Sequence, residues 1–175
     1  MDNKELSTTL KKDAVLAGLC QQWTDEWADD STRDDLLDKY IRGIDFCLKH
    51  NYPAPDFIKQ HFDADYLCEK GVYVDLVDNI QLKPVNIILG NSIIKAEVSS
   101  NCNQIYACHN SELYLDVCYK TKIWVTVMDY AKVHINCRKG SKVYLHKYSS
   151  SCFIEYVGDV SVKQKIGFFG EPLRR

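Results

Sequence analysis

The spacing of apolar residues changes once along this chain. Up to about residue 68, apolar side chains recur every three or four positions, which is the spacing of one helix face. From about residue 72 to residue 168, apolar and polar residues alternate, which is typical of strands. The pattern predicts an α+β protein with a helical head at 1–68, an all-β body of ten-residue strand repeats at 72–168 and a tail at 169–175.

The head contains one strongly amphipathic segment between residues 34 and 50. The segment Ser31-Thr32 offers a hydroxyl cap, and Asp34 and Asp35 follow in the first turn, where the helix dipole favours acids. The apolar face of the segment is made of Leu36, Leu37, Tyr40, Ile41, Ile44, Cys47 and Leu48. Pro53 prevents continuation, and Asp56 is expected to cap a last short helix.

Two tryptophans extend an earlier apolar stripe of the head. Trp23 and Trp27 continue the spacing that begins at Leu10. We interpret both as core residues. Anchoring of a partner is the alternative, since tryptophan is enriched at interface hot spots.

The body can be written as five consecutive ten-residue rows that begin at Ser111, Thr121, Ala131, Ser141 and Ser151. Each row opens with a small residue. Positions three, five and seven of every row are apolar except Lys147 and Glu155, so these positions are expected to face inward. Upstream, Ile94, Ala96 and Val98 alternate one step out of this register.

Short repeats of this kind form a β-solenoid or a curled antiparallel sheet or sandwich. Tight hairpins usually need Asn-Gly or Asp-Gly at the turn. Only one of the row junctions, at Gly140, contains glycine. The small residue at a fixed position of each row suits stacked coils, so the solenoid is favoured.

Alternation sends the fourth and sixth residues of each row outward. Position four carries Tyr114, Trp124, His134, Tyr144 and Ile154, and position six adds Tyr156. Contiguous exposed aromatics mark contact surfaces. The predicted partner-binding residues are therefore Tyr114, Trp124, His134, Tyr144 and Tyr156. The alternative is that aromatics simply fit the pleated surface of a sheet.

Charge and hydropathy reduce the number of partner classes and cellular locations that fit this chain. The net charge of −2 and the pI of about 6.2 argue against broad capture of nucleic acid. Lysines clustered beside the aromatics keep a single-stranded nucleic-acid binder as a lesser alternative. The polar first residues and the lack of a long apolar run predict a cytoplasmic protein that does not span a membrane.

The composition gives no positive sign of catalysis. The eight cysteines lack zinc-knuckle spacing and are interpreted as reduced thiols, several of them buried, with no metal site. No phosphate-binding, nucleophile-elbow or zinc-protease motif occurs. His134 and His146 are expected to share a face, but Cys137 is expected inward and His134 outward. We therefore expect no enzyme, no catalytic residues and no cofactor.

Several segments carry a resemblance to other proteins. They are residues 34–53, the segment Gly71-Val72-Tyr73-Val74-Asp75, and the row openings Asn110-Ser111-Glu112-Leu113 and Ala131-Lys132-Val133-His134-Ile135. In these segments the chain resembles an uncharacterised protein family of gut bacteria and their prophages, whose members have a helical head and a short β-repeat body. The resemblance implies a phage or mobile-element context and no catalytic residue.

Two classes of function follow from these expectations. The first is a non-enzymatic protein-binding or structural assembly module, which uses the outward aromatics to bind a partner protein or to form a homo-oligomer such as a trimer. The second is an inhibitor or immunity-type protein that binds one enzyme or toxin.

Overall fold

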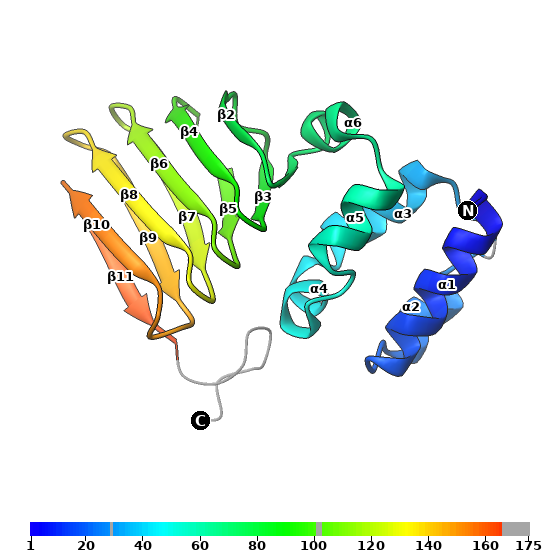
Figure 1. Cartoon of the computed structure of the whole chain (residues 1–175). Coiled ribbons are helices and arrows are strands. Elements are labelled where there is room, and N and C mark those ends of the chain that lie inside the picture. Colours follow the sequence, from blue (N-terminus) through cyan, green and yellow to red (C-terminus); the bar gives the residue numbers. More distant parts are fainter. Residues whose placement is uncertain (29, 101–102, 166–175) are drawn as a thin grey trace. The chain divides into compact units, whose positions relative to one another are not determined.

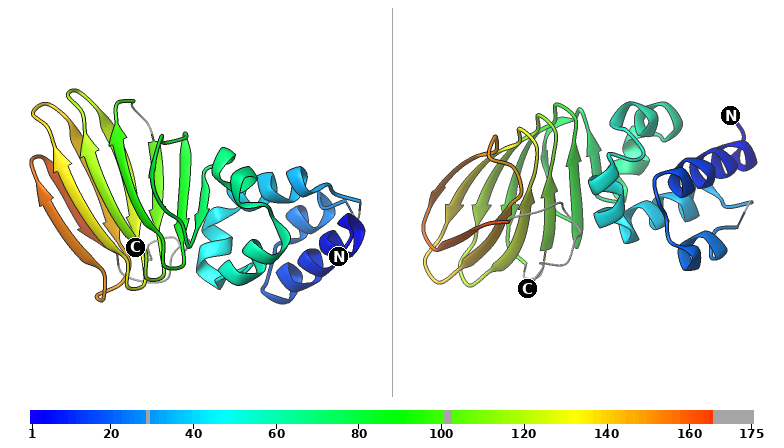
Figure 2. Two further views of the ribbon diagram at one scale, coloured as in Figure 1. Left: turned by 45° about the horizontal axis from the view of Figure 1, so that its top comes forward. Right: turned by 90° about the horizontal axis from the view of Figure 1, so that it is seen from below.

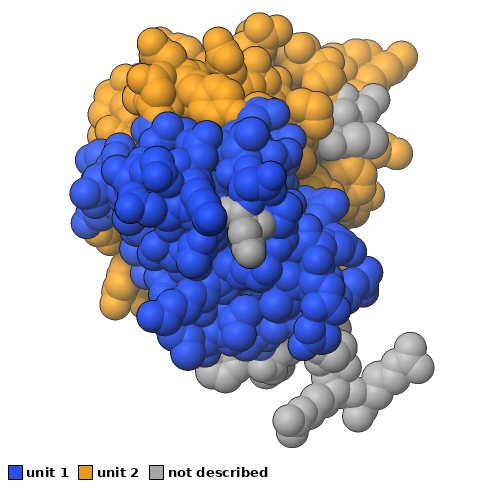
Figure 3. All heavy atoms as spheres, turned by 90° about the vertical axis from the view of Figure 1, so that its right-hand side faces the viewer, with its two compact units in different colours: residues 1–62, 168–175 blue, residues 63–167 orange. Residues whose placement is uncertain are grey.

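A computed structural model describes residues 1–28, 30–100 and 103–165 of the chain (Figure 1). The described residues form two compact units, residues 1–62 and residues 63–165, which are coloured separately in Figure 3. The first unit is helical. The second contains one short helix followed by parallel strands, so the predicted α+β class with a β-solenoid body is confirmed.

The first unit consists of α1 (Asn3–Leu16), α2 (Gln21–Asp25), α3 (Arg33–Arg42), α4 (Ile44–His50) and α5 (Pro55–His61). α3 begins with the predicted cap: the hydroxyl of Thr32 accepts a hydrogen bond from the amide of Asp35, and the Asp35 carboxylate accepts one from the amide of Thr32. Asp2 and Glu5 make the same reciprocal arrangement at α1. The residue before α5 is Ala54, so the expected cap at Asp56 is wrong, and Asp56 lies in the first turn instead.

The single helix expected between residues 34 and 50 is divided at Gly43 into α3 and α4. A β-carbon at this position would lie 3.2 Å from the ring of Trp23. The glycine therefore allows the indole to approach the backbone at the break. Apolar spacing alone continues through residue 43, which is why the sequence suggests one helix.

The second unit opens with α6 (Ala64–Glu69), which packs against the first strand. Its strands are β1 (Val72–Val74), β2 (Val77–Ile80), β3 (Val85–Leu89), β4 (Ile93–Val98), β5 (Asn103–Ala107), β6 (Glu112–Val117), β7 (Lys122–Val127), β8 (Lys132–Cys137), β9 (Lys142–Lys147), β10 (Phe153–Val157) and β11 (Val160–Gln164). Odd-numbered strands form one parallel sheet, here called sheet A, and even-numbered strands form a second, sheet B. Figure 2 shows successive coils stacked along the solenoid.

Each coil of the solenoid uses two of the ten-residue rows. Tyr114 on β6 therefore pairs with His134 on β8, and Trp124 on β7 pairs with Tyr144 on β9, in register. The predicted inward positions of β6 to β9 are buried except at Lys147, and together with Ile94, Ala96 and Val98 they form one core. Burying apolar surface contributes about 25 cal/mol per Å², so this shared core fixes the register of every coil.

The corners between strands repeat as regularly as the strands. Ser111, Thr121, Ala131 and Ser141, which open the first four rows, are buried at the corners, whereas Ser151, which opens the fifth, is exposed. At the corners after β5 and β7, His109 and Asp129 adopt the same left-handed backbone conformation. The amide of His109 donates to the Asp129 carboxylate over 2.9 Å, which links neighbouring coils.

The last row does not keep the predicted register. Four residues separate β7 from β8 and β8 from β9, but five residues, 148–152, separate β9 from β10. The extra residue places Cys152 in the buried corner position and pairs Phe153 with Lys132, which faces outward. Phe153, Glu155 and Val157 were expected inward and are all exposed, because a slip of one residue reverses the faces of a strand.

Candidate functional site

The outward aromatics do not form one ladder. Because consecutive rows belong to opposite sheets, Tyr114 and His134 lie on sheet B, whereas Trp124 and Tyr144 lie on sheet A. All four side chains lie outside the core, as predicted, but alternation along the sequence did not separate the two faces. The candidate site is therefore two surfaces, each with its own pair of stacked rings.

The pair on sheet B is closely stacked. The ring centroids of Tyr114 and His134 lie 4.5 Å apart with an interplanar angle of 9°. The ammonium of Lys95, on the preceding coil, lies 5.7 Å from the centroid of the Tyr114 ring, within range of a cation–π interaction. Parallel β-strands bring these three residues of successive coils into one column.

Carboxylates hold this aromatic pair from both sides. His134 Nδ1 lies 3.0 Å from the carboxylate of Glu155, and His134 Nε2 lies 3.8 Å from that of Glu112. The phenol of Tyr114 also donates a hydrogen bond to Glu112. This hydrogen bond raises the pKa of Tyr114, because ionisation would place a second negative charge beside the carboxylate.

A groove of about 1000 Å³ runs over the outer face of sheet B. Three of the five predicted partner-binding residues line it, namely Tyr114 and His134 in outward register and Tyr156 in inward register. Its charged lining residues are Glu97, Glu112, Asp116, Glu155 and one lysine, Lys95. The lining is therefore mainly acidic, with aromatic rings among the carboxylates, although Arg138 pairs with Asp116 over 2.7 Å and the ammonium of Lys132 lies 3.8 Å from Glu112.

Sheet A has the opposite charge. None of its strands contains an aspartate or glutamate, and β7, β9 and β11 carry Lys122, Lys142, Lys147 and Lys163. The rings of Trp124 and Tyr144 stack with centroids 5.5 Å apart and an interplanar angle of 17°. Trp124 is 40% exposed, so part of its ring is available to a ligand.

The last coil places Ile154 and Tyr156 differently from the expectation. Both fall in inward register, opposite Val133 and Ile135 of β8. Ile154 packs against the core and is not outward, whereas the Tyr156 side chain remains 47% exposed. Phe153, Val157 and Val162 are also exposed on the last two strands.

The thiols and imidazoles of the body are engaged in structural contacts. Cys137 is buried as expected, and the Cys118 thiol donates to Glu97 over 3.2 Å, which raises its pKa and disfavours the thiolate. His134 and His146 do not share a face, because β8 and β9 belong to different sheets. His109 Nδ1 accepts a hydrogen bond from the amide of Gly90. Within the described residues, no group of three or more His, Cys, Asp or Glu side chains is placed to hold a metal ion.

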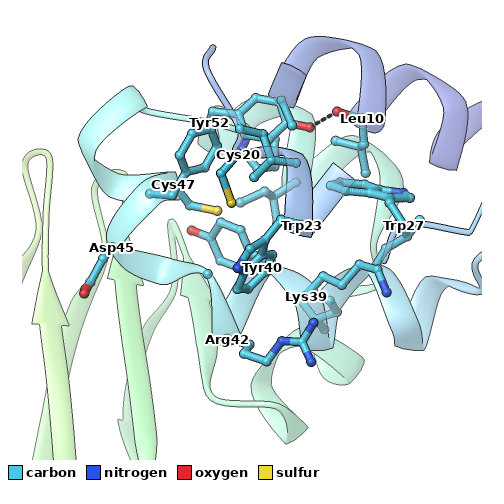
Figure 4. A pocket seen from close by; sticks show the side chains of 18 of the residues that line it. Leu10, Cys20, Trp23, Trp27, Lys39, Tyr40, Arg42, Asp45, Cys47 and Tyr52 are labelled. Carbon is cyan, nitrogen blue, oxygen red and sulfur yellow. Dashed lines mark hydrogen bonds between the residues drawn. The ribbon is translucent and has the colours of Figure 1, made fainter. Parts of the chain in front are cut away.

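The helical unit contains a second concave site that the sequence analysis did not predict. A cavity of about 350 Å³ lies among α1 to α5, and Figure 4 shows Trp23, Trp27, Tyr40 and Tyr52 around it. Trp27 is buried, and its indole N–H donates to the hydroxyl of Ser7, which supports the interpretation of Trp27 as a core residue. Trp23 is only partly buried. The amphipathic spacing identifies these aromatics as inward but cannot show that they leave space between them.

Among the residues described, no helix combines the length and the apolar character that crossing a membrane requires. Comparisons of the chain with protein-family models, with curated proteins and with solved structures found no match.

Proposed function

We propose that this chain is a non-enzymatic protein-binding module whose sheet B groove holds an extended, positively charged segment of a partner protein. The observation that carries the proposal is the acidic, aromatic lining of the groove. Carboxylates attract lysine and arginine side chains, and the stacked rings of Tyr114 and His134 add apolar surface beside these carboxylates.

The size of the groove supports a short extended segment. It is lined by residues of all five strands of sheet B, from Asn79 on β2 to Glu155 on β10. Strands lie about 4.8 Å apart, so the groove spans roughly 19 Å across them. At about 3.3 Å per residue, roughly six residues of extended chain fit in that length.

Fluorescence anisotropy with a labelled hexa-arginine peptide tests the proposal. We expect saturable binding that weakens as salt is raised, because the attraction is between exposed charges. The triple substitution Glu97→Gln, Glu112→Gln and Glu155→Gln should weaken binding at least tenfold. Lys122→Gln, on sheet A, is the matched control and should not weaken it. Equal affinity of the triple variant and the unmodified protein would reject the groove as the binding site.

A second candidate function concerns sheet A. Its strands combine lysines with the stacked Trp124–Tyr144 pair and carry no acid. This combination supports binding of single-stranded nucleic acid, in which bases stack on aromatic rings. Each stacked base contributes about 1–3 kcal/mol to the binding free energy. A labelled oligothymidylate should then bind the unmodified protein and lose at least fivefold in affinity with Trp124→Ala but not with Tyr114→Ala. Equal loss with both variants would contradict this assignment.

Self-association is a further form of the binding proposal. The exposed apolar side chains of β10 and β11, Phe153, Tyr156, Val157 and Val162, support it. The two phenylalanines of the tail, Phe168 and Phe169, lie outside the described residues. Light scattering distinguishes the cases: a mass near three times 20.2 kDa supports a trimer, whereas a constant monomer supports an inhibitor-type protein that binds another chain.

The phage or mobile-element context is a proposal based on the resemblance alone.

A further inference from the structure

The cavity of the helical unit is concave, apolar and separate from the sheet B groove. We propose that it binds a small, flat aromatic molecule that carries one negatively charged group, such as a carboxylate. Small-molecule sites are typically apolar cavities of about 300–1000 Å³ with a few polar groups that fix orientation. The cavity of about 350 Å³ falls within this range.

The inner wall of the cavity consists largely of aromatic rings, and the hydrogen-bond donors of Trp27 and Tyr52 are already paired within the protein. The indole N–H of Trp27 donates to Ser7, and the phenol of Tyr52 donates to the carbonyl of Leu10, as drawn in Figure 4. Burial raises the pKa of Cys47 to about 12, so its side chain is a neutral thiol at physiological pH. An occupant therefore meets no unsatisfied donor or charge along this wall, which favours an apolar ring system.

The volume of the cavity limits the size of the occupant. A cavity of about 150 Å³ lined by aliphatic and aromatic side chains is large enough for benzene. A cavity of about 350 Å³ therefore accommodates a molecule with two fused rings. The ring of Trp23 lines the cavity and lies against Gly43, so the indole supplies an aromatic wall beside such a molecule.

The charged side chains of the lining favour an anionic group. Lys39 and Arg42 line the cavity with one acid, Asp45, whose carboxylate points away from the cavity in Figure 4. The Arg42 guanidinium lies 4.8 Å from the Trp23 ring centroid and 3.2 Å from the carboxylate of Glu26. Glu26 does not line the cavity, so an anion stacked on Trp23 would compete with Glu26 for Arg42.

Isothermal titration calorimetry with 2-naphthoate and its neutral counterpart 2-naphthylmethanol tests this proposal on the full chain. We expect both compounds to bind and 2-naphthoate to bind at least threefold more tightly. Ala14→Leu adds side-chain volume at a buried residue that lines the cavity, and should abolish binding of both compounds. Val15→Leu, at an exposed neighbour on α1 that does not line the cavity, is the matched control and should bind as the unmodified protein does.

A second substitution tests the anionic group without altering the cavity wall. Glu26→Gln removes the competitor for Arg42 at an exposed position, and should tighten 2-naphthoate at least twofold while leaving 2-naphthylmethanol unchanged. Arg42→Gln should weaken the binding of 2-naphthoate only.

The proposed site would be overturned if neither compound bound, or if binding were unchanged in a folded Ala14→Leu variant. Equal affinities for the two compounds in the unmodified protein and in Glu26→Gln would overturn the anionic preference. Hexa-arginine binding is unaffected by all these outcomes, so failure here is distinguishable from failure of the groove proposal.

Discussion

The two outer faces of the solenoid share one core and differ in charge. Sheet A has no acid on any strand, whereas the strands of sheet B carry two lysines and five acids, Asp78, Glu97, Glu112, Asp116 and Glu155. Each face nevertheless has one pair of stacked rings at the same position of the row. The inward residues repeat every ten positions because both sheets pack on one core. The surface chemistry repeats every twenty, because each face receives only alternate rows.

The largest expected effect is a difference in stability loss between a core substitution and a surface substitution on the same strand. Ile123 is fully buried and Trp124 beside it is 40% exposed, although both lie on β7. Ile123→Ala should lower the free energy of unfolding by about 2–5 kcal/mol, because it leaves a cavity in the core. Trp124→Ala should lower the free energy of unfolding by about 1 kcal/mol or less, because this side chain is partly exposed. Urea denaturation measures both, and a larger loss for Trp124→Ala would show that sheet A faces inward.

A smaller difference in stability loss is expected between two buried serines at the corners that join the two sheets. The Ser141 hydroxyl accepts a hydrogen bond from the amide of Thr121 over 3.0 Å and donates one to the carbonyl of Cys118. The buried Ser111 hydroxyl has no hydrogen-bond partner among the described residues. Ser141→Ala should therefore lower the free energy of unfolding by about 1–2 kcal/mol, whereas Ser111→Ala should be neutral or stabilising. Thermal denaturation of the two variants side by side checks this, and equal losses would contradict it.

The smallest effect is a pH dependence on the basic face. Burial lowers the pKa of His146, and the positive charges of Lys165 and Lys163 lower it further. The folded protein therefore binds a proton at this site less readily than the unfolded chain, whose histidine titrates near 6.5. Stability should fall as pH drops below about 6.5 and level off below the folded pKa. His146→Gln should flatten this part of the curve of melting temperature against pH, and an identical slope would assign the dependence to other groups.

Sequence alone predicts the parts of this structure that depend on local spacing. The inward residues of β6 to β9 follow from alternation, and the start of α3 follows from the cap at Thr32. The register of β10 was wrong because one extra corner residue reverses a strand, and the polar Glu155 at an expected inward position was the only sign of it in the row from Ser151. The break at Gly43 depends on the approach of a distant ring, which helical spacing does not encode.

The candidate sites were predictable only in part. Alternation correctly placed Tyr114, Trp124, His134 and Tyr144 outside the core. It did not show that Tyr114 and Trp124 belong to opposite faces, because that depends on how many rows make one coil. The cavity of the helical unit was not predicted, since its volume arises from the packing of five helices that are separate in sequence.

The central claim, that sheet B binds cationic segments and sheet A does not, is most directly tested by nuclear magnetic resonance. The isotopically labelled protein is titrated with hexa-arginine while the backbone amide signals are followed. We expect the shifts to concentrate on β4, β6 and β8, around Tyr114 and His134, and to saturate with the affinity seen by anisotropy. Shifts centred on Trp124 and Tyr144, or no shifts at saturating peptide, would contradict it.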